Sequence, residues 1–192
     1  MGLYILMDIK IFWEIIDTAR NENTGFDGMY ESLVNRLAEL ETNDIFLWNN
    51  IFSEYQKLSY KRKLWAAAYV ICGGCSDDWF DYFRAWLTSR GKAAYLNALK
   101  DPETLCGVPA DDDYFFEEIM YAAKDAYCKK MRTGANRFYK EEEKHFLPDE
   151  IKNEMLSEIE YGQDIDMDIG LFHENEDNLR KLLPKLSKVF HF

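Results

Sequence analysis

The sequence contains no apolar run close to the roughly 20 residues that a membrane-spanning helix needs. Its apolar start, residues 1–7, is short and has neither a basic beginning nor a cleavage signal, so we expect no targeting peptide. The four cysteines are irregularly spaced, which favours free thiols over a disulfide framework. These absences predict a cytoplasmic protein that does not associate with membranes.

Histidine is also scarce, and its three copies, His145, His173 and His191, all lie in the C-terminal third. Cys75, a thiol next to a predicted helix start, is therefore left without an obvious general base. The two carboxylates that follow it also disfavour a thiolate. A small buried residue at a tight corner is the better interpretation of Cys75, and we predict no catalytic residue.

The pattern Cys72-x-x-Cys75 superficially suggests a metal site. Structural zinc usually needs a second close pair of ligands, whereas Cys106 and Cys128 are isolated. A redox pair would normally lie in a β-α-β unit, which the sequence does not predict. We therefore expect neither a metal nor another cofactor.

Positive charge is in short supply, because 23 Lys and Arg residues stand against 35 Asp and Glu residues, for a net charge of -12. The segment from Glu141 to Asp177 holds fourteen acidic residues against Lys144 and Lys152, a balance of -12, and the rest of the chain holds 21 of each sign. Such a segment repels nucleic-acid phosphates and attracts a basic partner within a Debye length of about 8 Å. We expect a basic protein partner and no nucleic acid.

Helical periodicity is what the sequence has in abundance. An apolar fraction of 47% and an aromatic fraction of 16% are typical of a folded globule. Apolar residues recur every three or four positions, which predicts helices near residues 8–20, 29–41, 42–55, 93–99, 116–127, 148–159 and 179–186, the last interrupted by Pro184. We predict an all-α fold, a single compact multi-helix domain.

The two most buried helices are predicted on either side of a glycine corner. Leu64–Cys72 reads L-W-A-A-A-Y-V-I-C and is apolar on every side. Gly73 or Gly74 supplies the left-handed residue that ends this helix, and Ser76 is expected to cap the next one. The predicted buried stripe of that next helix consists of Trp79, Phe83 and Trp86, joined by Phe80 and Leu87.

One segment departs from the helical pattern. Apolar residues alternate with acidic ones at Ile165, Met167, Ile169 and Leu171. This alternation, with a period of two residues, predicts a strand. Residues 3–6 are a candidate partner for it in a small two-stranded β element near the termini. The aspartates of the segment imitate the start of a calcium loop, but Ile and Asn stand where that loop requires Gly and Glu.

The run from Trp65 to Leu87, W-A-A-A-Y-V-I-C-G-G-C-S-D-D-W-F-D-Y-F-R-A-W-L, resembles the hallmark of a bacterial domain family of unknown function. Members of that family are also found beside WGR modules in proteins labelled molybdate-metabolism regulators. Phe12-Trp13, Ile16–Arg20 and Tyr95–Pro102 match further elements of the family. The resemblance implies a helical, cytoplasmic bacterial domain and brings no catalytic assignment.

The resemblance also implies a division of the chain. It covers most of residues 8–133, which we predict to be the helical core domain. Residues 134–192 are predicted to form an acidic C-terminal extension that packs on this core.

Two groups of charged residues are candidate binding sites. The first group consists of Asp77, Asp78, Asp81 and Arg84. It places carboxylates and an arginine along one predicted helix, where they could hold a divalent ion with a phosphate. Helix capping plus an ion pair, with Arg20 joining, is the simpler interpretation. The second group lies in the acidic segment and consists of Glu141, Glu142, Glu143, Asp164 and Asp166.

The concentrated acidity favours a protein-binding module, for instance an immunity or antitoxin protein that blocks a basic partner. The alternative is an enzyme or small-ligand protein that uses the first group on phosphorylated substrates. This alternative predicts a pocket beside the glycine corner, with Asp78 and Arg84 facing it. A nucleic-acid regulator fits poorly with the charge of the chain.

Overall fold

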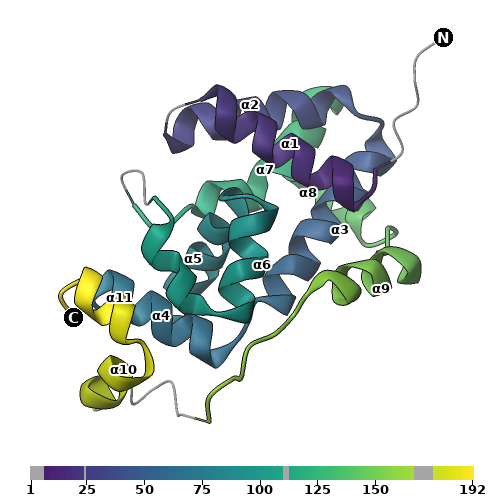
Figure 1. The fold of residues 1–192 in the computed structure, drawn as a ribbon. Helices are drawn as coiled ribbons and strands as arrows, with labels where there is room; N and C mark the ends of the chain where they lie inside the picture. The colour runs from purple at the N-terminus through teal and green to yellow at the C-terminus, as the bar shows by residue number, and fades with distance from the viewer. Residues whose placement is uncertain (1–6, 24, 110–112, 167–174) are drawn as a thin grey trace. The chain divides into compact units, whose positions relative to one another are not determined.

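The computed structural model describes residues 7–23, 25–109, 113–166 and 175–192. Within these ranges the chain forms helices and no strand, so the predicted all-α class is confirmed (Figure 1). The chain divides into two units, of which unit 1 contains Met1–Tyr55 and Glu117–Leu156, and unit 2 contains Gln56–Phe116 and Ser157–Phe192. The predicted C-terminal extension, residues 134–192, thus contributes to both units. The predicted boundary between the family-like domain and this extension, at residues 133–134, stays a prediction.

Unit 1 is built from helices whose buried faces are the predicted apolar ones. These are α1 (Ile9–Glu22), α2 (Phe26–Glu39), α3 (Thr42–Leu58) except its last turn, the 3-10 helix η2 (Glu117–Tyr121), α7 (Ala122–Met131), α8 (Ala135–Glu142) and most of α9 (Asp149–Glu158). Asp8 caps α1, because its carboxylate accepts a hydrogen bond from the Ile11 N–H at 2.7 Å. α2 packs against both α1 and α7 (Figure 1).

Aromatic side chains fill the interior of unit 1. Phe12 of α1 contacts Trp48 of α3, with ring centroids 5.3 Å apart, and both side chains are buried. The Trp13 indole N–H donates to the Tyr55 hydroxyl at 3.1 Å, which satisfies a buried polar atom. Burial of such rings is the main favourable term in folding. The predicted helical stripes of α1 and α3 are therefore the faces that form this core.

Unit 2 contains the last turn of α3 and the helices that follow it, together with those near the C-terminus. They are α4 (Arg62–Cys72), α5 (Asp77–Ser89), α6 (Lys92–Lys100), the 3-10 helix η1 (Pro102–Gly107), α10 (Glu176–Leu182) and α11 (Pro184–Val189). α4 contacts α5, η1 and α11, and its three consecutive alanines are fully buried, which allows these neighbours to approach closely. The Glu103 carboxylate accepts hydrogen bonds from the N–H groups of Lys185 and Leu186, so it caps α11.

The glycine corner between α4 and α5 forms as predicted. Gly73 has a φ of 67°, the left-handed conformation that ends α4, and Ser76 accepts a hydrogen bond from the Trp79 N–H as the cap of α5. The Trp65 indole N–H donates to the Cys75 carbonyl at 2.9 Å and so ties the corner back to α4. A short polar turn is thereby held firmly against an apolar helix.

The prediction that Trp79 is buried is wrong. Its side chain is 50% exposed and contacts the Phe115 ring. Phe80, which was also predicted to be buried, is buried and stacks on Trp65 with ring centroids 4.7 Å apart. Because consecutive helical residues point about 100° apart, a stripe that contains Phe80 turns Trp79 away from the core.

The predicted strand is not seen in the part of it that the structure describes. Residues 159–166 are extended but form no strand (Figure 1). The remaining positions of the prediction, residues 167–171 and the candidate partner 3–6, lie outside the described residues.

Candidate functional site

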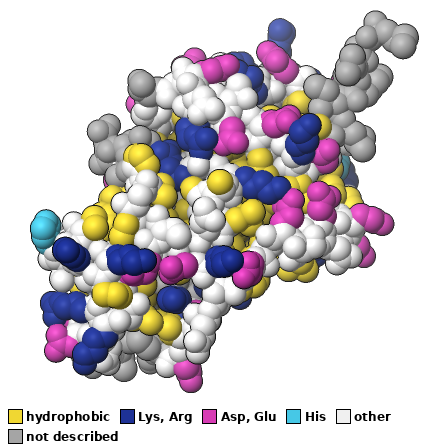
Figure 2. Space-filling model, in the orientation of Figure 1, with side chains coloured by type: hydrophobic (Ala, Val, Ile, Leu, Met, Phe, Trp, Pro, Cys, Tyr) yellow, Lys and Arg dark blue, Asp and Glu magenta, His cyan; other side chains and the backbone are white. Residues whose placement is uncertain are grey.

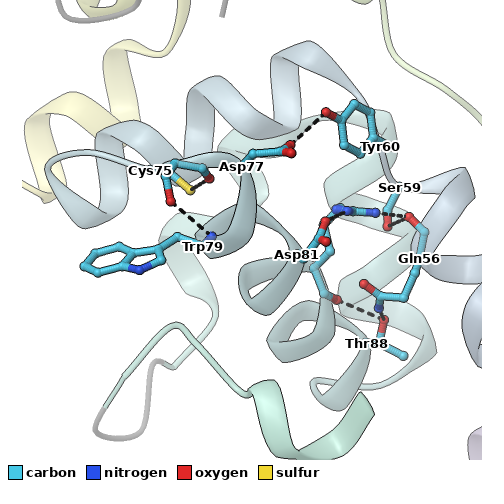
Figure 3. Close-up of polar contacts among 10 residues, drawn as sticks. Gln56, Ser59, Tyr60, Cys75, Asp77, Trp79, Asp81 and Thr88 are labelled. Carbon is cyan, nitrogen blue, oxygen red and sulfur yellow. Dashed lines mark hydrogen bonds and ion pairs between the residues drawn. The ribbon is translucent and has the colours of Figure 1, made fainter. Parts of the chain in front are cut away.

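The three aspartates predicted as a ligand site on α5 are not gathered around one point. Asp77 and Asp78 are exposed in the first turn of α5, and Asp81 is half-buried one turn later. The Asp77 carboxylate accepts a hydrogen bond from the Tyr60 hydroxyl at 3.0 Å (Figure 3). Carboxylates in the first turn of a helix also interact favourably with the helix dipole.

Arg84 turns into the protein, away from solvent. Its side chain is buried and donates hydrogen bonds to the Asp81 carboxylate and to the Gln56 backbone carbonyl. The Tyr60 ring lies over its guanidinium at 4.8 Å. Burial lowers the pKa of the Arg84 guanidinium, and the Asp81 carboxylate raises it in part. The positive charge is thus engaged inside unit 2.

The arrangement around Arg84 fits the simpler, structural interpretation. Gln56 lies in the last turn of α3, where carbonyl groups lack partners within the helix and favour a cation. The Gln56 side-chain amide also donates to the Thr88 hydroxyl of α5 at 3.1 Å (Figure 3). Arg84 therefore joins α5 to the end of α3. Arg20, the suggested additional member, pairs with Asp17 on its own helix at 2.9 Å.

Three of the predicted acidic residues lie at the end of α8 in unit 1. Glu141 forms an ion pair with Lys144 at 2.8 Å, and this hydrogen bond lowers the pKa of Glu141. Glu142 accepts a hydrogen bond from the Asn49 side-chain amide at 2.6 Å. Glu143 is exposed.

The other two predicted acidic residues belong to unit 2. The Asp164 carboxylate accepts a hydrogen bond from the Lys63 backbone N–H at 2.9 Å, and Asp166 pairs with Arg62 at 3.0 Å. Both carboxylates thus hold the first turn of α4. The acidic group of the sequence is divided between the two units, and its members in unit 2 are already engaged.

Sequence reasoning missed Phe146, which is 81% exposed between α8 and α9. The residue before it is fixed in place, because the His145 ring stacks on Phe46 at 4.2 Å and the Asn50 amide donates to the His145 carbonyl at 3.2 Å. A phenylalanine within a charged segment, followed by Leu147-Pro148, is the signal that could have drawn attention to this position.

The thiols of the glycine corner are protonated at neutral pH. Burial raises the pKa of both Cys72 and Cys75 to about 12. Among the described positions, no group of three or more His, Cys, Asp or Glu side chains has the arrangement of a metal site. None of the described helices has the length and apolarity needed to cross a membrane.

A small cavity of about 40 Å³ lies in unit 2, away from the α5 aspartates. Its walls come from α4, α6 and the extended residues 161–164. At this volume it has room for little more than water.

The fold and the site together define an all-α protein in which most of the predicted ligand groups make contacts within their own unit. Residues 7–129 match the model of the DUF4240 family, which is described as a protein of unknown function. Because the match covers more than half of the chain, the chain belongs to this family. The match ends before α8 begins. No curated protein and no solved structure matches the chain.

Proposed function

We propose that this chain is a cytoplasmic protein-binding module that holds a basic partner protein on the surface formed by α8, α9 and the connection between them. The observation that carries this proposal is the 81% exposure of Phe146, in a stretch of sequence that also exposes Glu143, Asp149 and Glu150. We call these four residues the acidic-aromatic surface. An immunity or antitoxin protein that blocks a basic toxin is the particular form that this chemistry favours.

Phe146 has the properties of an interface anchor. Burying a phenylalanine side chain contributes about 1.5–3 kcal/mol, and the described chain leaves this gain unused. His145 is held by Phe46 and Asn50, so the backbone that presents Phe146 is already ordered before a partner arrives. An aromatic side chain on an ordered backbone loses less entropy on binding than one on a mobile loop, and such residues dominate the affinity of many interfaces.

The charge around Phe146 selects for a basic partner. From Glu141 to Glu158 the chain carries seven acidic residues against Lys144 and Lys152. Both lysines are paired, with Glu141 at 2.8 Å and with Glu54 at 3.2 Å, so they do not attract an acidic partner strongly. Acidic side chains gather over α9 (Figure 2). Such a surface accelerates the encounter with a positive partner and repels nucleic acid.

The enzyme or ligand-binding alternative on α5 has less support. It required Asp78 and Arg84 to face a common pocket, whereas Asp78 is exposed and the Arg84 guanidinium contacts Asp81 and Gln56. Asp164 and Asp166, which the sequence assigned to the acidic binding group, are not included in the proposed surface because they contact α4 in unit 2.

The proposal is tested by identifying the partner in a pull-down from the native host and then measuring its affinity for purified variants. Phe146→Ala is expected to weaken binding by about tenfold or more, and Val189→Ala, which truncates a half-exposed apolar side chain in unit 2, is the matched control.

The charge of the acidic-aromatic surface is tested by Glu143→Lys/Glu150→Lys against Glu31→Lys/Glu39→Lys, which changes net charge equally on the exposed side of α2. The first pair is expected to slow association with the partner, most strongly at low salt. A partner that binds Phe146→Ala and Glu143→Lys/Glu150→Lys as tightly as the native protein would refute this surface.

A further inference from the structure

The last two residues of α9 and the extended residues that follow it, residues 157–166 together, form a segment that we call the acidic strap. It contains Glu158, Glu160, Asp164 and Asp166 and no basic residue. It belongs to unit 2 and has no helix beyond the end of α9 (Figure 1). After Glu158 its contacts are therefore made with the helices of unit 2 and not within a helix of its own.

Each acidic residue of the strap has a partner on α4 or α6. The ion pairs join Glu158 to Lys92 at 2.6 Å, Glu160 to Lys100 at 2.7 Å and Asp166 to Arg62 at 3.0 Å. The fourth carboxylate, Asp164, accepts from the Lys63 backbone N–H at 2.9 Å. The strap thus covers a basic surface with a matching row of negative charges.

The middle of the strap fits this surface through its backbone and its one aromatic ring. The Gly162 N–H donates to the Leu99 carbonyl at 3.0 Å, and the Tyr161 hydroxyl donates to the Leu58 carbonyl at 3.1 Å. The Lys61 ammonium lies 4.3 Å from the centre of the Tyr161 ring. A Cβ atom on Gly162 would lie 2.0 Å from the Lys100 carbonyl oxygen, so no larger residue fits there unless the strap moves.

We propose that the surface beneath the strap is a docking site for an extended acidic peptide of a partner protein, and that the strap is its intramolecular competitor. The surface already holds a segment of this chemistry. Two of the four partners at the strap, Arg62 and Lys100, are solvent-exposed side chains, and exposed pairs contribute little each and weaken with salt. A peptide with the same groups can therefore replace the strap.

A peptide fits this surface better than a nucleic acid does. The surface offers two carbonyl acceptors, of Leu99 and Leu58, in addition to its cations. Their partners in the strap are an N–H and an O–H group, which a peptide supplies and a phosphate backbone does not. The sign of the charge is opposite to that of the acidic-aromatic surface, so this inference does not depend on the proposed function.

The experiment releases the strap in the full chain and measures binding of a fluorescein-labelled peptide with the sequence of residues 157–166. Gly162→Ala forces the strap away from the Lys100 carbonyl, whereas Gly107→Ala places a methyl group in open space and is the control. The docked strap leaves only a fraction of the native molecules able to bind the peptide. Gly162→Ala is therefore expected to bind the peptide about tenfold more tightly than the native chain or Gly107→Ala. Hydrogen exchange of residues 157–166 is expected to rise in Gly162→Ala and to stay unchanged in Gly107→Ala.

A second variant covers the case in which Gly162→Ala does not fold. Glu160→Gln/Asp166→Asn keeps the backbone contacts and removes two ion pairs, and it is expected to raise peptide affinity in the same direction. Binding to either variant is expected to fall when Lys100→Gln is added, and to fall in about 1 M salt, where the Debye length is about 3 Å. Equal peptide affinity in all variants, unchanged exchange in Gly162→Ala, or binding of an oligothymidylate in place of the peptide would each overturn the proposal.

Discussion

Tyr30 of α2 donates a hydrogen bond from its hydroxyl to the carboxylate of Asp125 on α7, across 95 positions of the sequence. This contact lies within unit 1 and joins two helices that pack against each other. Burial, together with the negative charge of Asp125, raises the pKa of Tyr30 above its ordinary value of 10.0. The contact therefore requires the protonated hydroxyl.

Replacing Tyr30 by Phe is expected to lower the free energy of unfolding by about 1–2 kcal/mol near neutral pH, because a hydrogen bond to a charged acceptor is lost. The folded pKa is raised, so the stabilising effect is fully present below pH 10.0 and is lost as the pH rises above that value. Urea unfolding at about pH 8 and about pH 11 is the measurement. The native protein is expected to lose more stability between these values than Tyr30→Phe, and an equal loss would contradict the assignment. Tyr139→Phe, at an exposed position, is the control.

Arg84 is expected to be important for stability and not for ligand binding. Arg84→Ala removes the buried guanidinium from Asp81 and from the end of α3, so we expect a loss of about 2–4 kcal/mol. Asp78→Asn, at an exposed position of the same helix, is expected to cost less than about 1 kcal/mol. Chemical denaturation of the two variants compares these values. If Arg84→Ala left the free energy of unfolding nearly unchanged, the stabilising role of Arg84 would be refuted and the residue could serve another role.

The thiols of Cys72 and Cys75 are expected to react slowly in the folded protein. A rise in pKa from 9.0 to about 12 lowers the thiolate fraction at pH 8 by about a thousandfold. Site-resolved alkylation by iodoacetamide, followed by mass spectrometry in buffer and in urea, measures this protection. Rapid labelling of Cys75 in the folded state would instead support a reactive thiol at the corner.

Gly73 is expected to tolerate asparagine better than alanine. Its φ of 67° is in the left-handed region, where a Cβ atom costs about 1 kcal/mol and asparagine less. Gly134→Ala, at a glycine with a φ of -88° and open space around it, is expected to be nearly neutral. Thermal unfolding of the three variants checks the order, and equal losses for Gly73→Ala and Gly134→Ala would contradict it.

The α4–α5 pair could be predicted from sequence because local rules determine it. An apolar run, a left-handed glycine and a serine cap each act within a few residues of Gly73, and all three predictions are confirmed. Trp79 and Phe80 were both predicted to be buried, because periodicity defines a stripe without saying which of two neighbouring aromatic residues faces inward. The Phe80–Trp65 stacking that decides the matter is a tertiary contact.

The hydrogen-bond and ion-pair partners of the charged residues could not be predicted, because these residues are far apart in the sequence. Asp166 and Arg62 are separated by 104 positions, and Asp164 and Lys63 by 101. Counting charges along the sequence located the acidic segment but not its partners. Gly162, a glycine in an acidic stretch without helical period, was the available signal that this stretch lies close against another backbone.

The interleaved composition of the two units has a consequence for synthesis on the ribosome. In unit 1, Phe138 of α8 stacks on Phe46, and in unit 2, α11 packs against α4. Neither unit can therefore complete its core while only its early helices have left the ribosome. A fragment cut at residue 129, where the family match ends, would leave the Phe46 ring without this cover and would be prone to aggregate. The nascent chain must keep its first helices soluble until both late segments arrive.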